Sequence, residues 1–249
     1  MRVCKVYCFC MALKTSEKAL NTLCIDVGGT GVKIMLLDSS GKPLTERLRL
    51  PTPEDPTPTR VLAAVEKLKA QVPKFDRVAV GFPGVVKHGV IYTAANLHPE
   101  WVNFNLQTEL EKRWKKPVRV ANDAAVQGYA AIQGKGVEMI LTLGTGLGSA
   151  IYTDGHLCPG LELAHHPWIK GKTYEDFLGK RGFKKYGLKR WNKLLASAIQ
   201  QTAATFNWDQ LYLGGGNAKE IQFKLDKNIQ VISNEDGLLG GAALWQHDS

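Results

Sequence analysis

Short apolar segments alternate with amphipathic ones along this chain of 249 residues. β-Branched and aliphatic residues cluster between turn signals and predict strands at 22–27, 32–37, 44–50, 77–82, 118–120 and 210–213. Apolar residues recur at helical spacing within 59–72, 106–114 and 188–206, a helix is expected to open at 122–123, and small residues fill a last helix at 238–245. Strands that alternate with helices in this way predict an α/β fold.

One strand, turn and strand unit occurs twice. Residues 24–33 read Cys-Ile-Asp-Val-Gly-Gly-Thr-Gly-Val-Lys, and residues 140–150 read Ile-Leu-Thr-Leu-Gly-Thr-Gly-Leu-Gly-Ser-Ala. Glycine tolerates positive φ and lets the backbone approach a ligand closely, so that successive N–H groups can point at phosphate oxygens. A single copy is equally typical of an ordinary β-hairpin. Two copies in matching context predict a site that holds phosphate from two sides.

The predicted phosphate or nucleotide contacts are Gly28, Gly29, Thr30, Lys33, Gly144, Thr145, Gly146, Gly148, Gly214, Gly215 and Gly216. The last three form a turn from strand to helix. Tight packing of this turn would also explain why they are glycines. Asp26 closes the strand before the first turn, where a hydrated Mg²⁺ can lie between a carboxylate and phosphates. The segment 171–173, Gly-Lys-Thr, lacks the upstream glycine and the strand of a P-loop, and no Rossmann glycine pattern is present.

The composition allows one large domain or two lobes of roughly a hundred residues each, since 44% of the residues are hydrophobic. The repeated unit favours two lobes. We expect a weakly ordered N-terminal extension at 1–20, an N-terminal lobe at 21–122 and a C-terminal lobe at 123–249, with the last helix able to pack back on the first lobe. Met11 is an alternative start.

The formal net charge of +9 favours polyanionic partners. Seven cations fall between residues 180 and 193, a run that is usually a solvated helix face. Four of them are candidates for a track that holds a polymeric phosphate: Lys180, Lys184, Lys185 and Lys189. No apolar run reaches the ~20 residues that span a bilayer, and the five cysteines show neither a disulfide framework nor a zinc spacing. We expect a soluble cytoplasmic protein without a membrane partner.

Seven ordered segments resemble those of the ROK family of sugar kinases, and within it the branch similar to polyphosphate glucokinases. They are residues 26–33, 81–84, 93–97, 122–123, 143–150, 162–165 and 213–217. The resemblance implies two ribonuclease H-like lobes of the actin and hexokinase type, with an active-site cleft between them. A homodimer is also expected.

The resemblance assigns the catalytic base to Asp123. Phosphoryl transfer to a sugar hydroxyl needs a carboxylate that accepts the proton of the hydroxyl. The residue types at 122–123 alone would favour a helix cap instead, and one Asp can serve both roles. The sugar ligands that the resemblance implies are Gly84, Asn96, Asn122, Asp123, Glu162 and His165.

The chain departs from the family pattern at two places. Many members carry a cysteine-rich zinc motif after the segment that matches 162–165, but here His165 is followed by His-Pro-Trp, and Cys158 is the only nearby thiol. A structural zinc site needs about four ligands, so none is expected. Ala164 also stands where the family usually has glycine.

The leading hypothesis is Mg²⁺-dependent transfer of a phosphoryl group from inorganic polyphosphate, ATP or both to the 6-hydroxyl of glucose. An ATP-only kinase for another hexose would share every catalytic residue. A sugar-binding ROK-type regulator would need a DNA-binding module, for which the 25 residues before Asp26 are too few, so no nucleic-acid partner is expected. A polyphosphate phosphatase would leave the sugar ligands without a role.

Overall fold

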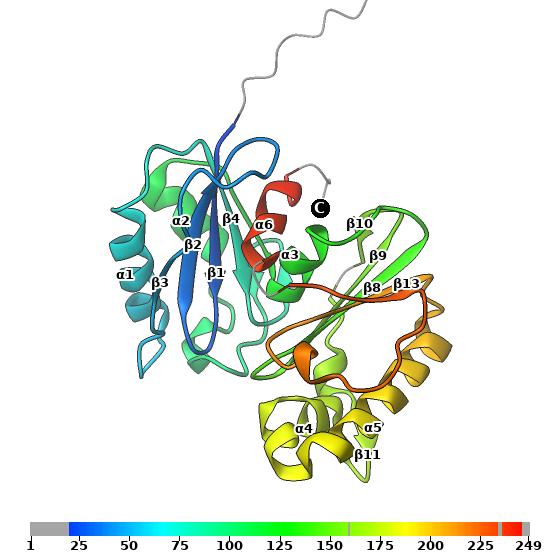
Figure 1. Ribbon diagram of the computed structural model, residues 1–249. Helices are drawn as coiled ribbons and strands as arrows, with labels where there is room; N and C mark the ends of the chain where they lie inside the picture. The colour runs from blue at the N-terminus through cyan, green and yellow to red at the C-terminus, as the bar shows by residue number, and fades with distance from the viewer. Residues whose placement is uncertain (1–19, 159, 234–235, 246–249) are drawn as a thin grey trace, which may run out of the picture.

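The computed structural model describes residues 20–158, 160–233 and 236–245 and contains two five-stranded sheets with helices on their faces (Figure 1). The first sheet has the order β3-β2-β1-β4-β7, from β1 (Thr22–Val27), β2 (Val32–Leu37), β3 (Leu48–Leu50), β4 (Arg77–Phe82) and β7 (Val118–Asn122). The second has the order β10-β9-β8-β13-β14, from β8 (Val137–Leu143), β9 (Leu147–Thr153), β10 (His156–Leu157), β13 (Gln210–Gly214) and β14 (Ile229–Val231).

The two sheets repeat one arrangement. In the first, β1 pairs antiparallel with β2 and parallel with β4, which pairs parallel with β7. In the second, β8 pairs antiparallel with β9 and parallel with β13, which pairs parallel with β14. The repeated glycine units are therefore the β1-β2 and β8-β9 hairpins, in equivalent places of the two sheets, and the predicted α/β class is confirmed.

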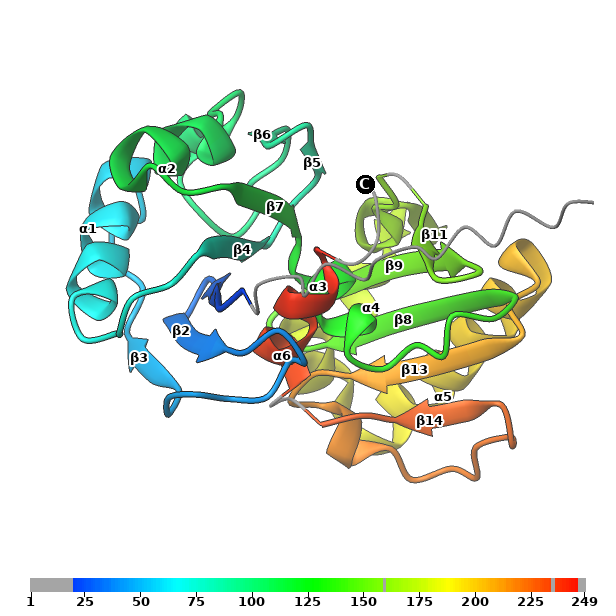
Figure 2. The same cartoon turned by 90° about the horizontal axis from the view of Figure 1, so that it is seen from above.

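Helices fill three layers around the sheets. The outer face of the first sheet packs against α1 (Pro58–Lys69) and α2 (Leu106–Trp114), and the outer face of the second against α4 (Tyr174–Leu178) and α5 (Lys180–Phe206). Between the sheets, α3 (Asp123–Tyr129) packs against α6 (Asp236–Ala243) (Figure 2). Helix α6 also contacts β1, β2 and β4, so this helix lies against the first sheet.

Short elements complete the described residues. They are β5 (Val86–Lys87), β6 (Val90–Ile91), β11 (Pro167–Ile169), β12 (Lys172–Thr173) and the 3-10 turns η1 (Pro99–Trp101), η2 (Leu163–His165) and η3 (Ala218–Glu220).

Several predicted boundaries are wrong. The strand expected at 44–50 is only β3, because the chain before it forms a bend in which the Leu36 N–H donates to Thr45 Oγ1 at 3.0 Å. The helix expected from residue 188 begins at Lys180, with a break at Gly187, where φ is 70° and ψ is 165°. The glycine turn after the strand at 210–213 was expected to lead into a helix, but it leads only into the short turn η3. The strand β14 then follows.

The predicted N-terminal extension lies outside the described residues apart from Leu20. The same holds for Met11 and the first three cysteines. Among the helices that the structure describes, none is long and apolar enough to cross a membrane.

Candidate active site

A cleft opens between the two sheets, where the β1-β2 and β8-β9 turns meet the end of β7, and it encloses a cavity of about 740 Å³. Most of the predicted site residues line it: Asp26, Gly28, Gly29, Thr30, Lys33, Gly84, Asn96, Asn122, Asp123, Gly144, Thr145, Gly146, Gly148, Glu162, His165, Lys180, Gly215 and Gly216. Gly214, Lys184, Lys185 and Lys189 do not line this cavity.

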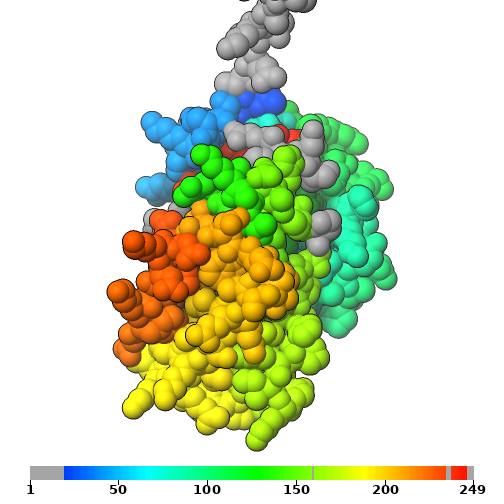
Figure 3. Space-filling model, turned by 90° about the vertical axis from the view of Figure 1, so that its right-hand side faces the viewer, coloured from blue at the N-terminus to red at the C-terminus, as the bar shows by residue number. Residues whose placement is uncertain are grey.

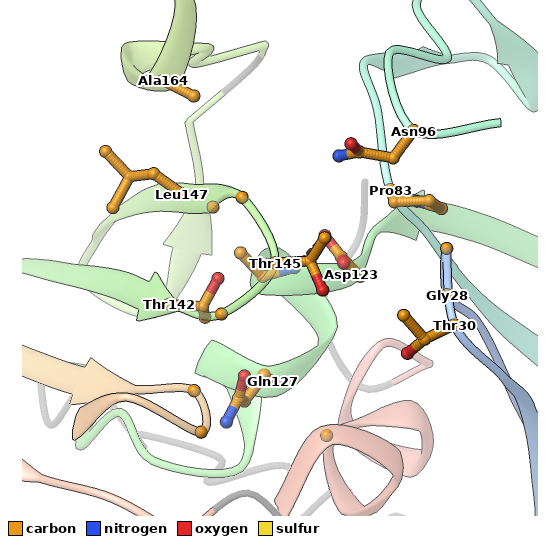
Figure 4. Close-up of a pocket in the computed structure, with 18 of the residues that line it drawn as sticks. Gly28, Thr30, Pro83, Asn96, Asp123, Gln127, Thr142, Thr145, Leu147 and Ala164 are labelled. Carbon is orange, nitrogen blue, oxygen red and sulfur yellow. Dashed lines mark hydrogen bonds between the residues drawn. The ribbon is translucent and has the colours of Figure 1, made fainter. Parts of the chain in front are cut away.

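The two hairpin turns approach the cleft from opposite lobes. In the first, the Gly28 N–H donates to the Gly31 carbonyl at 3.0 Å, and in the second the Gly144 N–H donates to the Gly146 carbonyl at 3.0 Å. Figure 4 shows Thr30 and Thr145 reaching toward the same central space beside Asp123. Backbone N–H groups and hydroxyls from both lobes can therefore bind one phosphate chain between them.

At the end of β7, two neighbouring residues have different roles: one caps helix α3, and the other presents a carboxylate to the cleft. Asn122 Oδ1 accepts hydrogen bonds from the N–H groups of Ala124 at 2.9 Å and Ala125 at 3.3 Å, and its Nδ2 donates to the Gly84 carbonyl at 3.1 Å. Asn122 is thus the cap of α3. Asp123, the next residue, accepts one hydrogen bond from the Ala124 N–H at 2.8 Å and lines the cleft.

The environment of Asp123 changes its acidity. Burial first, and then the charges of Asp26 and Glu162, raise the pKa of its carboxyl, whereas the Ala124 N–H and Lys33 lower it; together they bring the pKa from 3.8 to about 7. Some solvent still reaches the group through the cleft. A carboxyl that titrates near neutral pH is suited to take a proton during a reaction.

Asp26 and Lys33 face each other across the first hairpin. They are direct partners in the β1-β2 register, and Lys33 Nζ lies 2.5 Å from Asp26 Oδ2. The second carboxylate oxygen, Oδ1, accepts no hydrogen bond from the described residues. Mg²⁺ is often held by one or two carboxylates together with substrate phosphates and water, so this oxygen fits such an ion when a donor is bound.

No group of three or more His, Cys, Asp or Glu side chains in the described part of the chain is arranged to hold a metal by itself. The segment after His165 is instead held by aromatic packing. The Trp168 ring stacks on Tyr174 with centroids 4.5 Å apart and meets Phe177 edge-on at 5.4 Å. The sulfur of Cys158 lies 3.5 Å from Thr153 Oγ1.

The loop after β4 forms the opposite wall. A Cβ on Gly84 would overlap the Thr93 carbonyl, which explains glycine at this position by close backbone approach. Asn96 follows in the same loop and reaches both hairpin turns: a Cβ on Gly29 would lie 3.3 Å from its carbonyl oxygen, and one on Gly146 would lie 3.4 Å from its Nδ2. Asn96 therefore lies where the two lobes meet.

Glu162 and His165 lie on the second lobe at η2. His165 Nδ1 is 3.5 Å from Glu162 Oε2. Burial raises the pKa of the Glu162 carboxyl; His165 lowers it and Glu175 raises it. The pair can present an acceptor and a donor to neighbouring hydroxyls, which an apolar pocket does not distinguish.

The structure adds cleft residues that the sequence interpretation missed, among them Arg47, Gln127, Glu175, Asn217 and Lys219. Glu175 Oε2 accepts a hydrogen bond from the Leu147 N–H at 3.1 Å and lies directly over Gly146, so it supports the second phosphate turn. Its only sequence signal was the capping box formed by Thr173 and Asp176, which marks a helix start but not a cleft position.

A second cavity of about 280 Å³ adjoins the cleft. It shares Asn96, Thr145, Glu175 and Lys180 with the main cavity and adds Asp176, Gly179, Arg181 and Lys184. Of the four lysines proposed as a track, Lys180 therefore lines both cavities and Lys184 the second, whereas Lys185 and Lys189 line neither. Gly214 is buried, and a Cβ there would lie 2.8 Å from Gln127 Nε2.

Residues 22–168 match the profile of the ROK family. The chain is 31% identical over 230 residues to the polyphosphate glucokinase of Mycobacterium tuberculosis (strain ATCC 25177 / H37Ra), a match that covers 88% of this chain and 84% of that protein. It is 28% identical over 228 residues to the polyphosphate glucokinase of Mycobacterium leprae (strain TN), a match that covers 88% of this chain and 69% of that protein.

Among solved structures, the inorganic polyphosphate/ATP-glucomannokinase of Arthrobacter sp. strain KM superposes with a TM-score of 0.82 at 33% identity, over 93% of this chain and all of that one. A ROK family glucokinase from Streptomyces griseus, in complex with glucose and AMPPNP, superposes with a TM-score of 0.72 at 21% identity, over 90% and 98% of the two chains, and supports the fold alone. The predicted fold class, that of actin and hexokinase, is confirmed.

Proposed function

This chain belongs to the ROK family, and we propose that it is a sugar kinase that transfers a phosphoryl group from inorganic polyphosphate, ATP or both to the 6-hydroxyl of glucose. The observation that carries the proposal is the place of Asp123. A carboxyl with a pKa of about 7 lies beside two glycine turns that offer phosphate-binding groups from opposite lobes. The similarity to polyphosphate glucokinases supports the choice of glucose and of polyphosphate.

The chemical step follows from this arrangement. Glu162, His165 and the loop of Asn96 orient the sugar so that one hydroxyl points at the Asp123 carboxylate. As the hydroxyl oxygen attacks the terminal phosphorus, its proton moves to Asp123. The bond between phosphorus and the bridging oxygen breaks, and the shortened donor leaves with the electron pair. Mg²⁺, when bound with the donor beside Asp26, supplies positive charge to the phosphates.

Two other functions are tested by the same experiment. An ATP-only kinase for another hexose shares the catalytic residues, and a regulator that binds sugar without catalysis shares the sugar pocket. Purified protein with Mg²⁺ should be assayed with glucose, mannose and N-acetylmannosamine against ATP and long-chain polyphosphate. We expect glucose to be phosphorylated with polyphosphate. Sugar binding without any phosphoryl transfer would favour the regulator.

Glu162→Gln and His165→Ala are each expected to raise the sugar KM by about tenfold, because they remove hydrogen bonds to hydroxyls while leaving both phosphate turns intact. The donor KM should stay near the parental value. Steady-state kinetics with varied glucose measures both constants. His166→Ala is the matched control, since His166 is a neighbouring exposed histidine that does not line the cavity. A parental sugar KM in both test variants would place the sugar elsewhere.

The second cavity offers a path for the remainder of a polymer, because Lys180 borders both cavities and Arg181 and Lys184 continue from it. In the space-filling view, the yellow first part of α5 lies at the lower end of the molecule, beside the yellow-green segment that precedes it (Figure 3). No ion pair engages these three cations within the described residues. A polymer that binds several of them releases counterions, so its binding should weaken with salt.

Replacing Arg181 and Lys184 together by Gln is expected to raise the KM for long polyphosphate by about five- to tenfold and to leave that for ATP nearly unchanged. The control pair is Lys185→Gln with Lys189→Gln, which removes the same charge from α5 outside both cavities. The measurement is the donor KM at low and moderate salt. If both pairs of substitutions raised the polyphosphate KM equally, the charge of α5 would attract the polymer only through long-range electrostatics and not through contacts in the second cavity.

A further inference from the structure

The turn of the first hairpin is held by two residues that do not line the cleft. This turn comprises residues 28–31, between β1 and β2. Arg49 Nη2 donates to the Thr30 carbonyl at 3.1 Å, and Thr52 Oγ1 donates to the Gly28 carbonyl. Thr30 and Gly28 line the cavity, whereas Arg49 and Thr52 do not. The carbonyls of the turn are therefore bound by groups that lie outside the cleft.

Each of these carbonyls belongs to a peptide group whose N–H donates to no described residue. The Gly28 carbonyl shares its peptide group with the Gly29 N–H, and the Thr30 carbonyl shares its own with the Gly31 N–H. In a trans peptide the C=O and N–H bonds point in opposite directions, so both N–H bonds point away from the outer contacts. A carbonyl that accepts a hydrogen bond polarises its peptide group and makes the N–H a stronger donor. The outer contacts thus set the direction and the donor strength of two N–H groups.

Arg49 reaches the turn because of its place on β3. It is the direct partner of Lys33 in the β2-β3 register, and Lys33 is the partner of Asp26 on β1, so the three side chains lie on one face of the sheet. Lys33 pairs with Asp26, whereas Arg49 forms no ion pair with a described carboxylate. The charge of Arg49 is therefore available to the turn.

Glycine at position 31 makes room for this contact. A Cβ on Gly31 would lie 2.7 Å from Arg49 Nε and 2.9 Å from its Nη2. Gly31 is not among the glycines with positive φ, so alanine fits its backbone and would displace only the end of the long Arg49 side chain. A substitution at position 31 can therefore move the guanidinium off the turn without removing its charge.

The turn of the second hairpin has outer contacts of the same kind, made by the backbone. The Lys180 N–H, at the start of α5, donates to the Gly144 carbonyl at 3.1 Å and to the Thr145 carbonyl at 3.2 Å. Both turns therefore have carbonyls that are bound from outside. In the first turn the contact depends on side chains, so substitution can test it there.

We propose that Arg49 is a positioning residue for the phosphoryl donor. It acts through the peptide group between Thr30 and Gly31 and adds positive charge behind the turn, without contacting the donor itself. This inference rests on the proposed phosphoryl transfer. Loss of the contact weakens donor binding and leaves glucose binding unchanged.

The test measures the Kd of inorganic tripolyphosphate with Mg²⁺ by calorimetry, and the KM of tripolyphosphate and of glucose by steady-state kinetics. Arg49→Gln should raise both tripolyphosphate constants about fivefold and leave the glucose KM at the parental value, because it removes one charged hydrogen bond at an exposed site. Arg49→Lys should recover part of the affinity, since it restores the charge but not the planar guanidinium.

Lys42→Gln is the matched control. It removes the same charge from an exposed position beyond the other end of β2. The tripolyphosphate Kd should stay within about twofold of the parental value. A rise equal to that of Arg49→Gln would assign the effect to the overall charge of the lobe and overturn the inference.

Gly31→Ala gives an independent variant that keeps Arg49. It should raise the tripolyphosphate constants as Arg49→Gln does, and the double variant should be no weaker than either single variant, because both changes break one contact. Additive effects, a parental Kd in Arg49→Gln, or a glucose KM that rises as much as the donor KM would each overturn the inference. A parent that binds tripolyphosphate but transfers no phosphoryl group would refute the proposed function instead, and the Kd values would still decide the role of Arg49.

Discussion

Asp123→Asn is expected to lower kcat at least ~10²-fold while glucose still binds, because asparagine keeps the shape of the side chain but does not accept the hydroxyl proton. The variant retains an oxygen for the Ala124 N–H, which donates to Asp123 Oδ1 at 2.8 Å in the parent. Single-turnover rates and glucose titration by calorimetry separate the two effects. Near-parental turnover would remove Asp123 from the chemical step.

The pH dependence of the parent checks the same assignment. Since burial raises the pKa of Asp123 to about 7, kcat/KM should rise with pH and level off above that value. Glu162→Gln removes a negative charge that raises this pKa, so the rising limb should move to lower pH. An unshifted limb would assign the titration to another group.

The pH dependence of the stability of Asp123→Asn shows whether the variant is still folded. The pKa of Asp123 in the folded protein, about 7, lies above the ordinary 3.8, so the folded state binds the proton more tightly than the unfolded state. The contribution of this carboxyl to stability is therefore fully present below about pH 4 and is lost as the pH rises through 7. Above pH 7, Asp123→Asn should unfold at a temperature no lower than the parent does.

Removal of Mg²⁺ by a chelator is expected to lower turnover by on the order of a hundredfold or more, and restored Mg²⁺ should recover it, because the metal offsets charge on the transferring phosphate. Asp26→Asn should raise the Mg²⁺ concentration needed for half-maximal rate. Activity assays across Mg²⁺ concentrations and a thermal melt with the chelator measure both effects. The melting temperature should not change, since no described cluster holds a metal in the fold.

Lys33→Met is the matched control for Asp26→Asn. Lys33 lies 2.5 Å from the Asp26 carboxylate, so both variants break the same ion pair. Only the loss of Asp26 should increase the Mg²⁺ requirement, whereas the loss of Lys33 should raise the donor KM. Equal shifts in Mg²⁺ requirement would show that the ion pair, and not a metal, explains the role of Asp26.

Local patterns predicted the two hairpins and the helix start at Asn122 because each has a short-range physical cause. Glycine turns between strands of period two specify the β1-β2 and β8-β9 units, and an Asn that caps N–H groups specifies the start of α3. The apolar positions between 188 and 206 match the part of α5 that follows the break at Gly187.

Features that depend on distant partners escaped prediction. The strand β14 has only three residues, two of them exposed, and exists because it pairs with β13. Glu175 reaches the cleft only because α4 packs beside the second hairpin, which lies many residues earlier in the chain. Likewise, nothing in the basic run between 180 and 193 distinguished Lys184, beside the second cavity, from Lys185, which lines neither cavity.

The most direct measurement of the central claim is phosphorus NMR of a reaction that contains the protein, glucose, Mg²⁺ and long-chain polyphosphate, run in parallel with Asp123→Asn. We predict that the parent forms glucose 6-phosphate as the polymer chains shorten, and that the variant forms it at least ~10²-fold more slowly. A parent that binds glucose but forms no phosphorylated sugar from polyphosphate or ATP would contradict the account.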